Sequence, residues 1–303
     1  LRDNLISKGY TFETKCDTEV ILTSYIEYKD KCVNYLNGIF AFAIYNKMKN
    51  NIFLARDRLG IKPLFYSITN NTFVFASELK AILEHPDINP ILDKYGLMEL
   101  IGLGPAHTPG KTYFKNINEM LPGYIANFSN FTLNEEKYWD LVTKECNDTE
   151  KEAISKIHDL VVDATKRQLI SDVGICSMLS GGLDSSILAK IAKDNIDDLT
   201  TFSIDYVGNE NNFVSNDYQI SKDSDYVKIM AKFLNTKHKN IIVDNSILFN
   251  ILNESMIARD VPGMADIDSS MYIFCKKMVL KYAYLANVQT KYLVVILGIT
   301  RNI

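Results

Sequence analysis

Hydrophobic and polar positions follow a short, strand-like rhythm in the first part of the chain. Two apolar runs, 39–45 and 52–55, are separated by a polar turn and predict a β-hairpin. We expect another strand at 72–76 and helices at 17–28 and 78–83, the first with Asp17 as its N-cap. Because these short elements lack regular strand–helix–strand spacing, residues 1–128 are predicted to form an α+β domain.

A longer period begins near Glu152, where apolar residues recur at helical spacing. The pattern then alternates, with strands expected at 173–178, 200–205 and 240–243 and helices at 185–193, 225–234 and 247–258. Such alternation predicts a parallel sheet with helices on both faces, so residues 151–303 are interpreted as an α/β domain. The polar segment 129–150, which holds the single tryptophan, Trp139, is predicted to be a linker with a packed anchor.

Composition supports two globular domains and limits the classes of molecule that the chain is expected to bind. The chain has 303 residues, 47% hydrophobic and 23% charged, with a net charge of −4, which argues against a nucleic-acid binder. No apolar run is long enough to span a membrane, and the start has no signal-peptide pattern. The five cysteines form neither a paired framework nor a C-x-x-C site, so we expect free thiols and a cytoplasmic location.

One segment between a predicted strand and a predicted helix carries recognisable chemistry. It reads Ser180-Gly-Gly-Leu-Asp-Ser-Ser186. The glycines allow a tight turn whose N–H groups face an anion, and the two final serines stand at a helix N-terminus, which favours phosphate. Asp184 can hold Mg²⁺ against phosphate oxygens. The segment is not a Walker A loop, since no lysine follows the glycines.

This segment resembles the pyrophosphate loop of ATP pyrophosphatases, which activate a substrate as an adenylate. The first half adds motifs similar to the amidotransferase half of bacterial glutamine-hydrolysing asparagine synthetases, and further stretches fit the same family. These motifs are residues 17–21, 36–43, 55–66, 75–81, 121–123 and 258–272. The resemblance implies a truncated type 2 glutamine amidotransferase domain of the Ntn type at 1–128. An ATP-pyrophosphatase domain, similar to the adenine nucleotide alpha hydrolases, would follow at 151–303.

The family makes asparagine from aspartate, ATP and glutamine through β-aspartyl-AMP. The resemblance therefore implies glutamine, aspartate and ATP as small-molecule ligands, no nucleic acid or membrane partner, and a homodimer in the intact protein. Asp17 matches the residue that binds the α-amino group of glutamine, a role compatible with helix capping, and Asp184 is the expected Mg²⁺ ligand. The residues expected at ATP and pyrophosphate are Leu179, Ser180, Gly181, Gly182, Asp184, Ser185, Ser186, Ser203 and Ile204.

Other polar residues of the sequence are expected to have structural or surface roles. Arg56 and Asp57 are interpreted as a structural ion pair or turn, and Asp205 as a strand-end residue that faces water. The four histidines have no metal-ligand spacing and are expected at the surface. Residues 264–268 fall on the acceptor side of the implied site, without the cation that many family members carry near Asp266.

Both ends of the chain depart from the family pattern. In the family, the nucleophilic cysteine lies upstream of the position that matches residue 1. No intact catalytic residue is therefore expected in this chain. Residues 284–303 do not match the family motif L-S-G-E-x-x-D-E, yet codons that encode them spell that motif when read one base earlier. We therefore expect a frameshift in the gene or in its sequencing and an inactive chain as written. The coding DNA would test this.

Two alternative functions stay open at this stage. Ligases that close a β-lactam ring or amidate other carboxylates share the same architecture. A non-catalytic pseudogene product or binding-only remnant would also carry these motifs.

Overall fold

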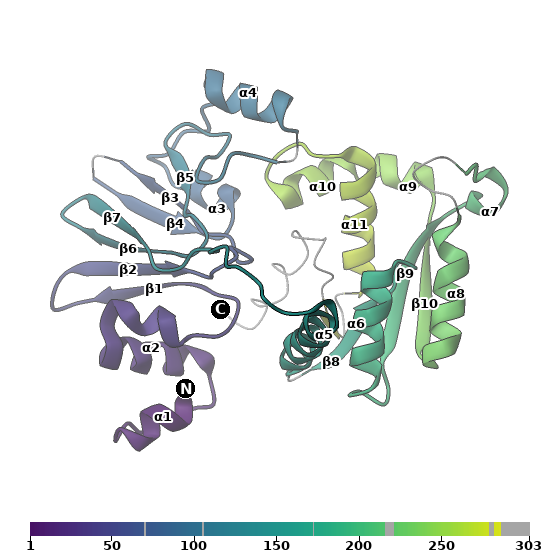
Figure 1. The fold of residues 1–303 in the computed structure, drawn as a ribbon. Helices are drawn as coiled ribbons and strands as arrows, with labels where there is room; N and C mark the ends of the chain where they lie inside the picture. Colours follow the sequence, from purple (N-terminus) through teal and green to yellow (C-terminus); the bar gives the residue numbers. More distant parts are fainter. Residues whose placement is uncertain (70, 105, 172, 216–220, 279–281, 286–303) are drawn as a thin grey trace. The chain divides into compact units, whose positions relative to one another are not determined.

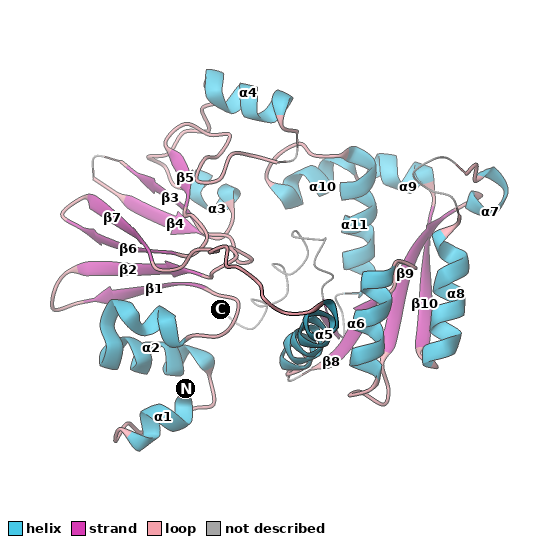
Figure 2. Ribbon diagram, viewed as in Figure 1, coloured by secondary structure: helices cyan, strands magenta, loops and turns pink. Residues whose placement is uncertain are grey.

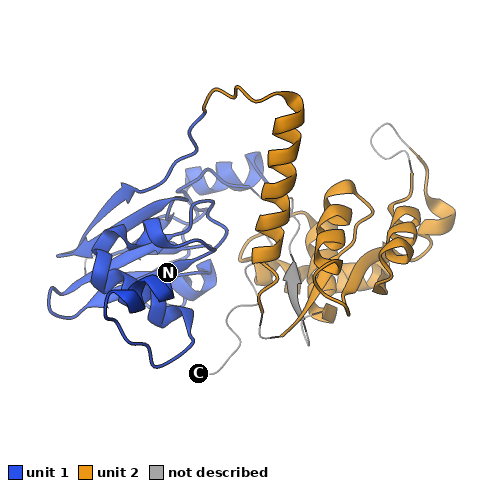
Figure 3. Cartoon of the chain, turned by 60° about the horizontal axis from the view of Figure 1, so that its bottom comes forward, with its two compact units in different colours: residues 1–143 blue, residues 144–303 orange. Residues whose placement is uncertain are grey.

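A computed structural model describes residues 1–69, 71–104, 106–171, 173–215 and 221–278, together with the backbone of strand 282–285. The chain forms two compact units, residues 1–143 and 144–303, shown in two colours in Figure 3. The tail predicted to be out of frame, 284–303, lies outside the described residues except for the backbone of its first two positions.

Unit 1 is an α+β unit, as the sequence predicts. Its elements, labelled in Figure 1, are α1 (Arg2–Ser7), α2 (Asp17–Tyr28), the 3-10 helix η1 (Lys29–Tyr35), β1 (Ala41–Asn46), β2 (Asn51–Arg56), β3 (Phe65–Ile68), β4 (Phe73–Ala76), α3 (Leu79–Leu83), α4 (Lys94–Gly102), β5 (Ile117–Glu119), β6 (Tyr124–Ser129) and β7 (Thr132–Lys137). The described strands form one sheet in the order β1-β2-β6-β7 and another in the order β4-β3-β5.

The predicted hairpin is confirmed: β1 and β2 pair antiparallel from Ala41 opposite Arg56 to Asn46 opposite Asn51. The linker prediction differs from the structure at its start, because Thr132–Lys137 is strand β7, paired with β6 at the edge of the first sheet. Polar residues mislead here, since an edge strand that faces solvent needs few apolar side chains. Trp139 follows β7 by two residues, and its backbone N–H donates to the carbonyl of Gly123 at 3.2 Å.

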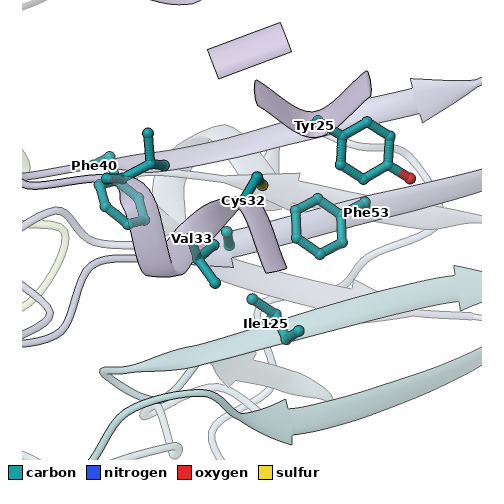
Figure 4. Packing of buried hydrophobic residues seen from close by; sticks show 8 residues of the cluster. Tyr25, Cys32, Val33, Phe40, Phe53 and Ile125 are labelled. Atoms are coloured by element: carbon teal, nitrogen blue, oxygen red, sulfur yellow. The ribbon is translucent and has the colours of Figure 1, made fainter. Parts of the chain in front are cut away.

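The core of unit 1 forms where α2 and η1 cover the first sheet (Figure 4). Tyr25 stacks on Phe53 with ring centroids 5.0 Å apart, and Val33 and Ile125 pack beside them. Cys32 is fully buried here, and burial raises the pKa of its thiol to about 12. This cysteine is therefore a structural apolar residue, not a reactive one.

Arg56 and Asp57 hold the turn that follows β2. The Asp57 carboxylate, 2% exposed, accepts the N–H groups of Leu59, Ile61 and Lys62 at 2.9–3.1 Å. The Arg56 guanidinium donates to the carbonyls of Gly60, Lys62 and Met120 and pairs with Glu119 at 2.9 Å. The turn role predicted for these two residues is confirmed, while the ion pair of Arg56 is made with Glu119 and not with Asp57.

The buried pair of Arg56 and Glu119 predicts acid sensitivity. Burial alone would raise the pKa of Glu119, but the hydrogen bond to His107 and the charge of Arg56 outweigh burial and hold that pKa below its usual range. A carboxylate with a lowered native pKa stabilises the fold above its unfolded pKa of about 4.5, and this stability is lost as pH falls through the native value. Thermal unfolding of Glu119→Gln should therefore depend less on pH below about 4.5 than unfolding of the wild type. An unchanged pH profile would contradict this.

Unit 2 alternates helices and strands (Figure 2). Its elements are α5 (Glu150–Arg167), β8 (Gly174–Met178), α6 (Leu183–Lys193), β9 (Thr200–Tyr206), α7 (Asn209–Asn212), α8 (Asp223–Leu234), β10 (Lys237–Val243), α9 (Asn245–Asn250), α10 (Leu252–Arg259), α11 (Ala265–Met278) and β11 (Tyr282–Leu285). The strands lie in the order β10-β9-β8-β11, and every neighbouring pair is parallel. The predicted helix at 247–258 is divided into α9 and α10.

Helices cover both faces of this sheet, as predicted. On one face, Ile273, Phe274 and Met278 of α11 pack against Phe202 of β9 and Cys176 of β8. A second cluster joins α6 and α8 and ends at the residue after β8; its members are Leu179, Ala189, Val227, Ala231 and Leu234. The strand–helix connections at the carboxyl ends of β8 and β9 are thereby held at one edge of the sheet.

Candidate functional site

The nucleotide loop, defined here as residues 179–186, joins β8 to α6. Leu179 is 1% exposed, and its N–H donates to the carbonyl of Phe202 at 2.8 Å, which continues the parallel ladder onto β9. Helix α6 begins at Leu183, two residues earlier than predicted, so Ser185 and Ser186 stand in its first turn. The loop therefore lies at the carboxyl edge of the sheet, beside residues 202–204 of β9.

Gly181 has the backbone conformation and the surroundings that require glycine. Its φ is +86°, and a Cβ at this position would stand 2.6 Å from the carbonyl oxygen of Asp223 and 3.3 Å from the Cβ of Tyr226. The first turn of α8 thus packs directly against the loop. Gly182 differs, because its φ is −76° and the nearest atom to an added Cβ is 3.5 Å away.

The loop hydroxyls hold its shape from within. The Oγ atoms of Ser180 and Ser185 lie 3.0 Å apart, and the N–H of Ser180 donates to Ser185 Oγ at 3.2 Å. Ser185 and Ser186 donate to the carbonyl of Gly182 at 3.0 and 2.8 Å. Among the described side chains none caps the N-terminus of α6, so its first N–H groups remain available to an anion.

Asp184 stands in the first turn of α6 with its residue exposed. Within the described ranges no three acidic, histidine or cysteine side chains gather into a metal cluster. Mg²⁺ commonly takes one or two carboxylates together with substrate phosphates. Asp184 is one carboxylate in the first turn of a helix whose N-terminus has no side-chain cap among the described residues, which fits that pattern.

Ser203 and Ile204 point to opposite faces of β9. Ser203 is 7% exposed, and its Oγ lies 3.1 Å from Nε2 of His238 and 3.1 Å from Oδ1 of Asn240. Ile204 packs toward the cluster of Phe202 and Phe274. The structure brings both residues next to the nucleotide loop, while a role in binding ATP stays a prediction.

His238 corrects the expectation of surface histidines. It lies half-buried on β10, with Nδ1 3.0 Å from Thr201 Oγ1, and burial lowers its pKa. The sequence signal was present, because Thr201, Ser203, His238 and Asn240 are polar residues at alternate positions of two strands. The polar ladder becomes visible only in the register of the two strands, where His238 lies opposite Thr201 and Asn240 opposite Ser203.

The acceptor-side segment is held by an ion pair. Arg259 Nη1 lies 2.6 Å from Asp268 Oδ1, and a Cβ on Gly263 would stand 1.9 Å from the other carboxylate oxygen. The hydroxyl of Tyr206, at the end of β9, donates to Ser270 Oγ at 2.9 Å and ties α11 to this edge of the sheet. Arg259 of α10 is thus paired with Asp268 inside this segment.

Asp17 lies in unit 1 as the first residue of α2, and it is exposed. The N-cap is Cys16, not Asp17 as predicted. The capping interpretation of Asp17 is therefore wrong, and a role in binding glutamine stays a prediction.

Cys16 should be the most reactive of the five cysteines. Hydrogen bonding to Thr18, from its side chain and its backbone, lowers the pKa of the exposed Cys16 thiol, whereas burial raises the pKa of Cys32 and Cys176 to about 12. Because thiolates are the reactive species, iodoacetamide at neutral pH should label Cys16 first in the native chain. Mass spectrometry of tryptic peptides measures this, and faster labelling of Cys176 would contradict it.

No helix in the described part of the chain is both long and apolar enough to cross a membrane.

Comparison with known proteins agrees with this geometry. A model of the glutamine amidotransferase domain matches residues 1–139, and a model of asparagine synthase matches residues 156–282. The chain therefore joins a segment similar to glutamine amidotransferase domains to one similar to asparagine synthase domains.

The curated relatives name the family more closely. Asparagine synthetase [glutamine-hydrolyzing] 3 of Bacillus subtilis is 42% identical over 283 residues, which cover 92% of this chain and 46% of the relative. Asparagine synthetases 1 and 2 of the same organism are 35% and 31% identical, covering 68% and 82% of this chain and 32% and 33% of the relatives. The chain belongs to the glutamine-hydrolysing asparagine synthetase family, and it spans less than half the length of these relatives.

Proposed function

We propose that this chain carries the pyrophosphate-binding part of an ATP-dependent, glutamine-hydrolysing asparagine synthetase. The synthetase that contains this chain would activate aspartate as β-aspartyl-AMP and amidate it with ammonia from glutamine. The single observation that carries the proposal is the nucleotide loop at the carboxyl edge of the parallel sheet, uncapped at α6 and packed on α8 through Gly181.

The loop geometry suits release of pyrophosphate from ATP. The first N–H groups of α6 donate to phosphate oxygens, and the helix dipole favours the charge that builds on the leaving group. Ser180 and Ser185, already bonded to each other, keep the loop in this conformation before ATP arrives. Mg²⁺, held by Asp184 and the phosphates, would screen their charge. Leu179, Ser203 and Ile204 would border the nucleotide, since Leu179 directly follows β8 and the other two lie on the adjacent strand β9.

Unit 1 would serve as the glutaminase half, with an Ntn-type fold. Two antiparallel sheets and a covering helix layer support this assignment. Asp17, exposed at the start of α2, would bind the α-ammonium group of glutamine. We also propose that the protein acts in the cytoplasm, that the intact enzyme is a homodimer, and that the chain as written is inactive and binds ATP weakly.

The test uses the full-length enzyme with the reading frame restored. Pyrophosphate release should depend on aspartate, and release driven by another carboxylic acid instead would favour the alternative class of carboxylate-amidating ligases. Asp17→Asn should raise KM for glutamine at least about tenfold, because one charge-assisted hydrogen bond is lost, and should leave ammonia-dependent synthesis unchanged. An equal loss of ammonia-dependent synthesis in this variant would show that Asp17 does not act in glutamine binding.

A further inference from the structure

Two neighbouring strands of unit 2, β9 and β10, present one apolar and one polar face. Phe202 of β9 and Ile241 of β10 belong to the cluster that packs against α11. Because side chains alternate along a strand, the neighbouring positions point to the opposite face. These positions carry the polar ladder, which consists of Thr201, Ser203, His238 and Asn240. Leu179, which begins the nucleotide loop, also points to this face, where it packs with α6 and α8.

The hydrogen bonds of the polar ladder follow one direction. Oδ1 of Asn240 can only accept, so the Ser203 hydroxyl donates its single proton there, at 3.1 Å. Nε2 of His238, 3.1 Å from the same Oγ, must then be the donor. Burial lowers the pKa of His238 and favours the neutral ring, so Nδ1 accepts the hydroxyl proton of Thr201 at 3.0 Å. The structure thus contains a neutral imidazole whose Nε2–H points at Ser203.

The ring of His238 is held in place by a buried partner. Thr201 is 0% exposed, and its oxygen lies 2.8 Å from the hydroxyl oxygen of Thr236 as well as near His238. A ring that is bonded at both nitrogens has one orientation. The Ser203 oxygen, held by that ring, has given away its proton and keeps one lone pair. A bound molecule can therefore only donate to it.

Ser203 lies where β9 runs past the end of β8. The N–H of Leu179 donates to the carbonyl of Phe202, and Ser203 is the next residue of β9. The chain that leaves β8 at this point is the nucleotide loop. The adenosine part of ATP offers hydrogen-bond donors, an amino group and two ribose hydroxyls, of the kind that this oxygen accepts.

We propose that His238 is a positioning residue of the nucleotide site, which fixes the Ser203 hydroxyl where it accepts a hydrogen bond from the adenosine part of ATP. This role rests on the proposed function, since it requires ATP at this edge of the sheet. His238 touches no substrate and acts only through Ser203.

Steady-state kinetics of the full-length enzyme, with the reading frame restored, test this role. His238→Asn can still bond Thr201 but is too short to reach Ser203, so it should raise KM for ATP about fivefold and change kcat less than about twofold. His238→Gln carries an amide N–H close to the position of Nε2, so KM should stay within about twofold of the wild type. Ser203→Ala should raise KM about fivefold, and adding His238→Asn should raise it no further, because the two residues act as one unit.

Thr236→Val is the matched control, because it breaks the polar network at its far end. Thr201 keeps the proton that it donates to His238, so Ser203 stays in place and KM for ATP should not change. If His238 only stabilised the fold, Thr236→Val and His238→Asn would raise KM alike, and that result would overturn the positioning role. Equal KM values in His238→Gln and His238→Asn would overturn it too.

A second measurement needs no ATP and uses residues 1–303. The ¹⁵N chemical shifts of the imidazole should place the proton of His238 on Nε2 at neutral pH. Ser203→Ala should shift this resonance and leave that of the exposed His158 unchanged. A proton on Nδ1 would overturn the positioning role, because Nε2 could then not donate to Ser203.

The kinetic outcomes separate the role of His238 from the proposed function. Gly181→Ala, measured in the same assay, reports on the nucleotide loop alone. If it raises KM for ATP while His238→Asn and Ser203→Ala are additive or without effect, only the role of His238 is overturned. If Gly181→Ala also leaves KM unchanged, the proposed nucleotide site is overturned with it.

Discussion

Gly181→Ala should weaken ATP binding at least about tenfold, because the left-handed backbone and the adjacent carbonyl leave no room for a Cβ. The added carbon would stand 2.6 Å from the Asp223 carbonyl oxygen, at a φ of +86°. To relieve the close contact and the strained φ, the loop must move away from α8. Its N–H groups then no longer point in a common direction. The expected result is a local change of site geometry in a folded protein.

Gly182→Ala is the matched control, one residue along the chain. At Gly182 the φ is −76° and the nearest atom to a Cβ is 3.5 Å away, so alanine fits. Because binding to the chain as written is expected to be weak, broadening of the ³¹P resonances of ATP is the suitable measurement. Broadening in the wild type and Gly182→Ala but not in Gly181→Ala is expected, and equal broadening in all three would contradict the assigned role of the loop.

Arg56→Met should destabilise unit 1 by about 3–5 kcal/mol, since it leaves a buried carboxylate without its counter-charge. The side chains of Arg56 and Glu119 are 5% and 12% exposed, and Arg56 also donates to three carbonyls that hold the turn after β2. The variant removes all of these bonds while it keeps much of the side-chain volume.

Urea unfolding measures this effect in two ways. Trp139, the single tryptophan, reports on unit 1 by fluorescence, and circular dichroism reports on the whole chain. Lys80→Met is the control, because the Lys80–Glu78 pair is 41% and 46% exposed and should contribute less than about 0.5 kcal/mol. Similar losses of unfolding free energy in both variants would show that burial does not strengthen the contribution of the Arg56–Glu119 pair.

Local patterns of residues in the sequence determined many of the strands, helices and turns of this protein. The β1–β2 hairpin follows from two apolar runs around a polar turn, and the parallel sheet of unit 2 follows from its strand–helix alternation. The turn between β8 and α6 was also predicted from the sequence, because the glycines and serines that form it are contiguous in the chain. Periodicity and turn chemistry act over a few residues, so a linear reading can detect them.

Tertiary structure alone decided the contacts between distant segments. Sequence did not show that Glu119 completes the pair of Arg56, that Asp223 closes against Gly181, or that His238 bonds Ser203. It also predicted a linker where β7 forms, since the pairing of an edge strand depends on its neighbour β6 more than on its own residues. These contacts join residues far apart in the chain, and only the folded backbone brings their side chains within hydrogen-bonding distance.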